Sequence, residues 1–197
     1  MIDLRTTVDI PRCWFQMVED SEGLDFQMNS DLQLGSLLKT LVSAKASPSV
    51  LELGTGVGLA LSWMVEGLAA DGSITSIDHD PALIAVARSY FAGDPRVDII
   101  CEDAEGWITS NQEARFDIIF ADTWAGKYLL LEETLQMLKP NGIYIVDDMR
   151  PADTWPDGHE AKAEHLINCL EQRSDLNVTK LEWSTGIVIA TKMEIRS

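Results

Sequence analysis

Three glycines in one short loop are the first residues whose spacing points to ligand binding. Gly54, Gly56 and Gly58 fall between an apolar run and an amphipathic run, and Thr55 lies among them. Glycines in such a turn let the main chain bend sharply and come close to a ligand, as in nucleotide-binding loops. The pattern G-x-G-x-G alone is a weak signal, because structural turns and sites for several nucleotides share it.

Carboxylates beside the loop make the signal more specific. Glu52 immediately precedes the loop, and Asp78 ends the next apolar run, followed by His79. Ligands of open α/β sheets bind beyond the carboxyl ends of the strands, which would place Asp78 to accept both hydroxyls of a ribose. The alternative is a structural turn. We assign that role to Asp80, which would cap the helix that Pro81 opens.

More acidic residues follow the later apolar runs, and we expect them at the same edge of a sheet. They are Asp103, Asp122, Asp147 and Asp148. Such a ring repels phosphate groups and attracts a divalent metal or a sulfonium that carries an ammonium group. The charge therefore favours S-adenosylmethionine over a nicotinamide dinucleotide, whose fingerprint would also place a glycine at Leu59. Asp98 and Asp117 lie near strand beginnings, and we interpret both as solvated structural residues.

The elements that must position these residues alternate along the chain from residue 50. Apolar runs predict strands over 50–53, 73–77, 97–101, 116–121 and 142–146, and helical spacing predicts helices over 59–68, 81–90, 127–137 and 160–173. This alternation predicts right-handed βαβ units on a mostly parallel sheet.

The last two predicted strands, 178–183 and 187–191, are separated by only three residues. So short a connection requires an antiparallel hairpin. The predicted fold class is α/β, with a doubly wound, mostly parallel seven-stranded sheet and a C-terminal antiparallel hairpin. This order of elements resembles the Rossmann-like arrangement of class I methyltransferases.

The N-terminal part is predicted to be helical. Ser30 and Gln33 have capping-box spacing, and leucines recur at helical intervals up to residue 44. We expect a single domain over 1–197, with a helical cover over 1–46 and an α/β core over 47–197. Trp14, Met17 and Met28 could cover a site, although core packing is the stronger expectation for them.

Composition excludes several classes of protein. The 197 residues include 15 basic and 32 acidic side chains, a formal net charge of -17 that would repel nucleic acid. No apolar run is long enough to cross a membrane, and the N-terminus lacks signal-peptide features, so we expect a cytoplasmic protein. The three cysteines are widely spaced, which predicts reduced thiols and neither a disulfide framework nor a zinc site.

Residues 116–124, Tyr128, 129–133 and 138–148 together resemble the catechol and caffeoyl-CoA O-methyltransferases. With the glycine loop and residues 78–81, the resemblance extends over about residues 50–151. It implies a class I S-adenosylmethionine-dependent methyltransferase that O-methylates a small hydroxylated molecule. The acceptor itself is not identified, and the oligomeric state, monomer or homodimer, stays open.

The resemblance also implies roles for single residues. Asp122, Asp147 and Asp148 match the family's ligands for Mg²⁺ or a related ion, with Asp148 in place of the usual asparagine. The alternative is that Asp122 and Asp147 cap loops or bind substrate directly. Trp124 resembles a tryptophan beside the methyl donor, and core packing is the alternative for it.

Asp103 and Ala104 occupy the usual adenine-side turn, where the carboxylate would accept from the exocyclic amine and the Ala104 amide would donate to a ring nitrogen. Residues 149–159 are expected to form a loop that shapes the acceptor pocket. Trp155 and His159 are candidates there for stacking or hydrogen bonding to the acceptor, and the alternative is that both are ordinary loop residues.

One position departs from the family. The catalytic lysine corresponds here to Ala125, and Lys127 could replace it only if the loop shifts. The alternative for Lys127 is a solvated lysine in the first turn of a helix. A non-catalytic S-adenosylmethionine-binding protein therefore stays open. The competing enzyme function is a nicotinamide-dependent oxidoreductase.

Overall fold

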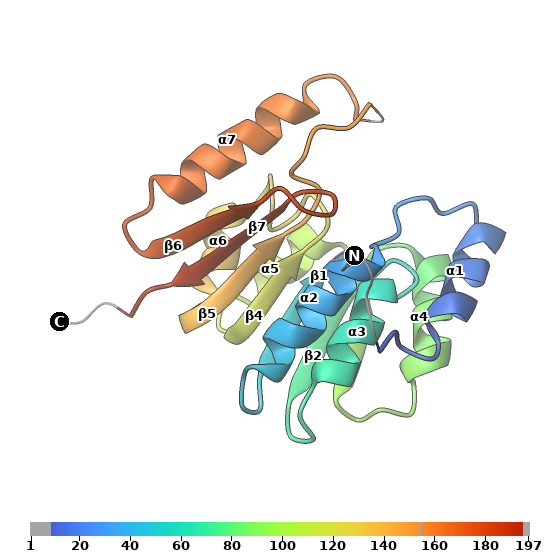
Figure 1. Ribbon diagram of the computed structural model, residues 1–197. Helices are drawn as coiled ribbons and strands as arrows, with labels where there is room; N and C mark the ends of the chain where they lie inside the picture. The colour runs from blue at the N-terminus through green and yellow to red at the C-terminus, as the bar shows by residue number, and fades with distance from the viewer. Residues whose placement is uncertain (1–8, 154, 195–197) are drawn as a thin grey trace, which may run out of the picture. The chain divides into compact units, whose positions relative to one another are not determined.

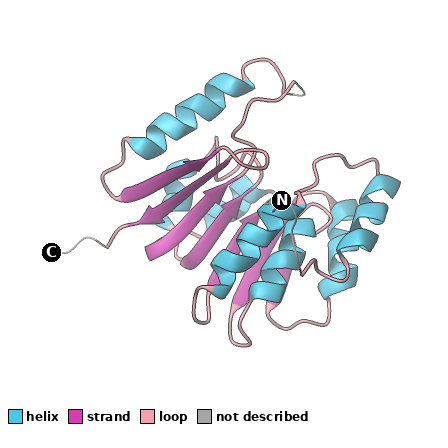
Figure 2. Cartoon of the chain, viewed as in Figure 1, coloured by secondary structure: helices cyan, strands magenta, loops and turns pink. Residues whose placement is uncertain are grey.

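The computed structural model describes residues 9–153 and 155–194 (Figure 1). The chain divides into two compact units, residues 1–103 and 104–197. Each unit has its own strands and helices. Figure 2 shows helices in cyan and strands in magenta. The predicted single domain stays a prediction, and residues 1–8 of the predicted helical cover lie outside the described residues.

The first unit contains three parallel strands. They are β1 (Ser49–Leu53), β2 (Ser73–Asp78) and β3 (Val97–Cys101), in the order β3-β2-β1. Four of the five residues of β1 are buried, as expected for a parallel strand covered on both faces. The predicted strands are confirmed to within one residue at each end.

Four helices accompany these strands. They are α1 (Trp14–Gly23), α2 (Leu32–Ser43), α3 (Leu59–Gly67) and α4 (Pro81–Phe91). Helices α2 and α3 pack very closely, because a Cβ on Gly35 would lie 2.3 Å from the indole of the buried Trp63. Only glycine fits at residue 35 without moving that indole.

The two predicted helix caps had different outcomes. Asp80 accepts from the amides of Ala82 (2.8 Å) and Leu83 (3.4 Å), so it caps α4 as predicted. The predicted cap at Ser30 is wrong, because Asp31 is the residue before α2 and accepts from the Leu34 amide at 2.8 Å. Both residue types cap well, so sequence alone did not decide between neighbours.

Helix α1 was not predicted as a separate element. The Tyr90 hydroxyl of α4 donates to Asp20 of α1 at 2.6 Å, and Met17 is fully buried. Core packing is therefore confirmed for Met17. It is wrong for Met28, which lies beyond α1 and is 78% exposed.

The second unit contains four strands in the order β4-β5-β7-β6. They are β4 (Phe116–Ala121), β5 (Leu138–Val146), β6 (Leu176–Leu181) and β7 (Ile187–Lys192). Strands β4 and β5 are parallel, whereas β7 is antiparallel to β5 and to β6. The predicted hairpin is confirmed, although β6 ends earlier than predicted and leaves a five-residue connection. Strand β5 begins four residues before the predicted start, beside a register shift at 116–118 of β4.

The helices of the second unit are α5 (Ala104–Ser110), α6 (Leu131–Gln136) and α7 (His159–Glu171). Helix α5 was not predicted, and α7 agrees with its prediction. The predicted helix over 127–137 is wrong at its start, because Leu130 has a left-handed backbone conformation (φ 56°) and ends a tight turn. This difference places Lys127 in the turn rather than in a helix.

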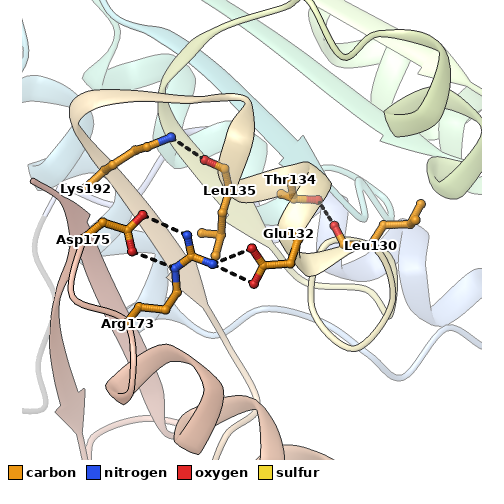
Figure 3. A network of polar contacts seen from close by, with 7 residues as sticks. All are labelled: Leu130, Glu132, Thr134, Leu135, Arg173, Asp175 and Lys192. Carbon is orange, nitrogen blue, oxygen red and sulfur yellow. Dashed lines mark hydrogen bonds and ion pairs between the residues drawn. The ribbon is translucent and has the colours of Figure 1, made fainter. Parts of the chain in front are cut away.

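Arg173 connects the segment between α7 and β6 to α6 in the second unit (Figure 3). Its guanidinium makes two bonds to Asp175, at 2.9 and 2.8 Å, and also pairs with Glu132 of α6. Lys192 of β7 donates to the Leu135 carbonyl at 2.8 Å. These contacts hold α6 against the strands. Their net contribution to stability is modest, because Glu132 is largely exposed to water.

Two expectations about the whole chain can be compared with the structure. None of the three cysteines forms a disulfide among the described residues, and reduced thiols stay a prediction. Within residues 9–153 and 155–194, no helix is long and apolar enough to cross a membrane.

Candidate active site

The glycine loop connects β1 to α3 in the first unit. All three of its glycines have positive φ, at 101° for Gly54, 54° for Gly56 and 95° for Gly58. The Gly54 amide donates to the Ile77 carbonyl of β2 at 2.9 Å, and the Gly58 amide donates to the Thr55 carbonyl at 2.9 Å. Side chains other than glycine rarely adopt this conformation, so the loop depends on these residue types.

Asp78 holds this loop through its carboxylate. One oxygen, Oδ2, accepts from the Gly56 amide at 2.9 Å, and Oδ1 accepts from the Asp80 amide at 3.0 Å. A carboxylate can accept about four hydrogen bonds, so two positions remain for a ligand. His79 lies beside it, with Nδ1 3.6 Å from Asp78 Oδ1, and its side chain is 82% exposed.

Glu52 lies beneath the loop and is fully buried. The Ser76 hydroxyl donates to Glu52 Oε2, and Ser76 Oγ is 2.6 Å from the Thr55 hydroxyl. Burial raises the pKa of Glu52 to about 8, so the carboxyl group is largely protonated at neutral pH. Glu52 is thus connected through Ser76 to Thr55 of the loop, and it supports the loop from the interior of the first unit.

Phe26 is a residue of this region that sequence reasoning missed. Its ring lies 3.3 Å from the position that a Cβ on Gly56 would take, and Met17 Cε lies 2.9 Å from that of Gly58. The connection between α1 and α2 therefore lies against the glycine loop. The only available signal was an aromatic residue in a polar segment, which does not specify a contact so distant in sequence.

Asp103 and Ala104, the residues predicted to lie beside the adenine, stand on either side of the sequence boundary between the two units. Asp103 is exposed and follows β3, and Ala104 is buried as the first residue of α5. Because the two residues belong to different units, their roles toward an adenine ring stay predictions.

A cluster of carboxylates lies at the ends of two strands of the second unit. Asp122 follows β4, and Asp147 and Asp148 follow β5. The strands are parallel, with Ala121 paired to Val146, so their carboxyl ends meet. One oxygen from each of the three aspartates lies within 4.8 Å of the others. Carboxylate oxygens in such a group suit a hard divalent cation.

Asp147 is the most enclosed member of the cluster, with 3% of its surface exposed. Burial and the neighbouring charge of Asp148 raise the pKa of Asp147 to about 6. The Thr185 hydroxyl, from the connection between β6 and β7, donates to Asp147 Oδ1. Sequence reasoning missed Thr185, because the antiparallel hairpin brings it to the cluster from far along the chain.

Lys127 is buried beside this cluster, with 5% of its surface exposed. Its Nζ donates to the main-chain oxygen of Asp147 at 2.5 Å. Burial lowers the pKa of Lys127, and the charges of Asp122, Asp148 and Asp147 partly oppose that shift. The predicted alternative of a solvated first-turn lysine is therefore wrong.

The turn that carries Lys127 explains its position. The amides of Tyr128 and Leu129 both donate to the Trp124 carbonyl, at 2.8 and 3.0 Å, and Gly126 has a positive φ of 78°. The Tyr144 hydroxyl of β5 donates to the Gly126 carbonyl. This turn folds residues 124–129 back on themselves, which directs Lys127 inward although it lies two residues after the family's lysine position.

Trp124 lies on the same turn and is 44% exposed, so core packing is wrong for it. His159 is the first residue of α7, and Trp155 precedes it in the loop over 149–158. The rings of Trp155 and His159 stack with centroids 4.3 Å apart. The two acceptor-site candidates are thus in contact with each other.

Comparison with known proteins identifies the family. The family model described as O-methyltransferase matches residues 16–193. The chain belongs to the O-methyltransferase family. Two relatives with O-methyltransferase names, from Mycobacterium avium and Mycobacterium tuberculosis, are 28% identical over 120 residues and 30% identical over 118 residues. Each match covers 57% of this chain, and the chain spans about half, 53%, of the length of these curated relatives.

Solved structures of O-methyltransferases share the fold. The enzyme TomG from Streptomyces achromogenes, in complex with SAM, has a TM-score of 0.81 and 20% identity, covering 97% of this chain and 93% of that one. An O-methyltransferase from Bacillus cereus, in complex with SAH, has a TM-score of 0.83 and 18% identity, covering 96% and 94%. This likeness confirms the predicted fold class, a seven-stranded mixed sheet of order 3-2-1-4-5-7-6.

Proposed function

We propose that this member of the O-methyltransferase family transfers a methyl group from S-adenosylmethionine to a hydroxyl group of a small molecule. The observation that carries the proposal is the glycine loop, whose Gly56 amide is bonded to the Asp78 carboxylate. This arrangement leaves acceptor positions on Asp78 for the two ribose hydroxyls. The relatives solved with SAM and SAH support the same donor.

The donor site in this proposal is built from residues with distinct roles. Gly54, Thr55, Gly56 and Gly58 form the loop, and Asp78 binds the ribose, with His79 beside it. Glu52 supports the loop through Ser76. Asp103 and Ala104 are assigned to the adenine. The resemblance assigns Trp124 to a position beside the methyl donor, and Asp122 is proposed to contact the donor as well.

Methyl transfer is a direct displacement at carbon. The acceptor oxygen forms a bond to the methyl carbon while the bond from carbon to sulfur breaks, and the sulfonium becomes a neutral thioether. The hydroxyl proton passes to Nζ of Lys127, which is the proposed general base. Burial of Lys127 favours its neutral form, which is the form that can accept the proton.

The acidic cluster is proposed to hold a divalent cation such as Mg²⁺. Its ligands would be Asp122, Asp147 and Asp148, and the bond from Thr185 would orient Asp147. The three carboxylates fit such an ion because their oxygens are close enough to repel one another without a cation. When bound, the ion would lower the pKa of an acceptor hydroxyl.

The two alternatives are weaker than this proposal. Membership of the O-methyltransferase family speaks against a nicotinamide-dependent oxidoreductase. A non-catalytic binding protein was suggested by Ala125, but the buried Lys127 supplies an amine beside the acidic cluster. Ala125 therefore gives little support to a non-catalytic protein.

Isothermal titration with S-adenosylhomocysteine, first without and then with Mg²⁺, tests the proposal. We expect a micromolar Kd, followed by methyl transfer from S-adenosylmethionine when hydroxylated small molecules are supplied. Binding without turnover of any acceptor would favour the non-catalytic alternative. Absence of binding in both conditions would overturn the donor assignment, and NADH would then be titrated.

Asp78→Ala is expected to weaken S-adenosylhomocysteine binding by about 1.5–3 kcal/mol, or roughly 10- to 150-fold in Kd. The reason is that the ribose loses its charged partner and the Gly56 amide loses its acceptor. Asp80→Ala is the matched control, since it removes a carboxylate two residues away that caps α4. The control should lower stability by about 1 kcal/mol and leave Kd unchanged. Equal Kd values for Asp78→Ala and wild type would remove Asp78 from the site.

A further inference from the structure

An aromatic group in the second unit contains a tyrosine and a histidine, Tyr128 and His159, that the proposed reaction does not use. Tyr128 Oη is 3.0 Å from His159 Nε2, and the two rings meet edge to face with centroids 5.3 Å apart. Trp155 stacks on His159, and Trp124 meets both Tyr128 and His159 edge to face. Lys162 Nζ lies 3.9 Å above the Trp124 ring. The turn that carries Trp124 and the segment around the start of α7 therefore meet at the Tyr128 and His159 pair.

The pair lies close to the groups proposed to activate the acceptor. Lys127 Nζ is 5.2 Å from the centre of the Tyr128 ring. Burial, together with the charge of Asp148, raises the pKa of Tyr128 to about 12, so its hydroxyl keeps its proton at neutral pH. Burial and the charges of Lys127 and Lys162 lower the pKa of His159, although Asp148 opposes this, which favours the neutral imidazole.

A neutral imidazole carries one proton, and the surroundings of the ring indicate which nitrogen holds it. His159 Nδ1 is buried and has no hydrogen-bond partner among residues 9–153 and 155–194. A buried N–H group without a partner is rarer in proteins than a buried acceptor without one. The proton is therefore favoured on Nε2, which donates to Tyr128 Oη. The Tyr128 hydroxyl then accepts from His159 and keeps its own hydrogen for another partner.

We propose that Tyr128 is a specificity-determining residue, whose hydroxyl donates a hydrogen bond to the acceptor molecule and is held in place by the Nε2–H group of His159. This inference rests on the proposed methyltransferase function. The oxygen that Tyr128 contacts is not the one that is methylated, because a hydrogen bond donated to the attacking oxygen would reduce its nucleophilicity. Tyr128 instead selects acceptors with a second oxygen near the reacting hydroxyl. A site built to donate to that oxygen rejects analogues that lack it.

The tautomer of His159 can be measured without any acceptor. A long-range proton–nitrogen NMR spectrum distinguishes Nδ1–H from Nε2–H imidazoles. The chain has only three histidines, so the spectrum of His159→Gln assigns the His159 signals by difference. We expect the Nε2–H tautomer, and the Nδ1–H tautomer would overturn the proposal. This measurement is independent of methyl transfer, so its failure is distinguishable from failure of the proposed function.

Kinetics with catechol and phenol test the role of Tyr128 itself. Tyr128→Phe is expected to raise KM for catechol about tenfold, to change kcat by less than about twofold, and to leave S-adenosylhomocysteine affinity unchanged. The preference for catechol over phenol in kcat/KM should fall by the same factor of about ten. An unchanged preference would overturn the proposal, as would a wild-type protein that binds S-adenosylhomocysteine but does not methylate catechol.

Substitutions of His159 separate positioning from packing. Glutamine can place an amide donor near the former position of Nε2, whereas leucine fills space without donating. We expect His159→Leu to reproduce the KM effect of Tyr128→Phe and His159→Gln to restore most of the lost affinity. Equal KM values for the two variants would show that the imidazole only fills space.

Discussion

Lys127→Met is expected to reduce kcat by about 10²- to 10⁴-fold, the range for loss of a general acid or base. Methionine fills a similar volume but cannot accept the proton that leaves the acceptor hydroxyl. Affinity for S-adenosylhomocysteine should stay within about twofold of wild type, because the proposal assigns Lys127, which bonds to the Asp147 main chain, to the acceptor and not to the donor. Single-turnover rates with saturating donor are the measurement.

Lys139→Met is the control for Lys127→Met. It removes a lysine whose Nζ pairs with Asp117 at 2.8 Å on a partly exposed surface. We expect no change in kcat and less than about 1 kcal/mol in stability. Thermal unfolding of Lys127→Met is needed as well, since the Asp147 carbonyl loses its donor. A folded Lys127→Met protein with wild-type kcat would exclude Lys127 as the base.

Asp147→Asn is expected to weaken Mg²⁺ binding by about 100-fold or more and to remove any metal-dependent part of the activity. Loss of a residue that only orients a metal ligand lowers metal affinity about 10- to 100-fold. Loss of a charged ligand itself should lower the affinity at least as much. Asparagine keeps an oxygen that can accept from Thr185, so the hairpin contact survives while the charge is lost. Direct titration of the protein with Mg²⁺ gives the affinity without reference to turnover.

The matched control for Asp147→Asn is Asp117→Asn, which changes a carboxylate of β4 that pairs with Lys139. Mg²⁺ affinity should not change in this control. If Asp147→Asn also bound Mg²⁺ with wild-type affinity, the assignment of Asp147 as a ligand would be wrong. The role of the cluster would then be to balance the charge of Lys127.

Local sequence patterns predicted the parts of the fold that depend on residues close together in the sequence. The strands of the first unit follow from short apolar runs, and Asp80 caps α4 because the cap, the proline and the helix are contiguous. The glycine loop followed in the same way, since its positive φ angles depend on residue type. Family resemblance then brought together Asp122, Asp147 and Asp148, which the parallel pairing of β4 and β5 places at one edge.

Residues whose positions depend on distant contacts could not be predicted. Lys127 is directed inward by a turn that Gly126 and Tyr144 stabilise, and Tyr144 lies on another strand. Thr185 reaches Asp147 through the hairpin, and Phe26 meets the glycine loop across about 30 residues of sequence. Periodicity describes each segment by itself, so it predicted a helix at Lys127 where tertiary contacts favour a turn.

The bond between Asp78 and the Gly56 amide has a consequence for the energetics of recognition. Because the carboxylate already fixes the loop, the conformational entropy of these residues is lost when the chain folds and not when a ligand arrives. A preorganised loop lets more of the contact energy appear as affinity. The same side chain holds the loop and would bind the ligand, so the conformation of the loop and its selectivity for a ligand cannot evolve independently.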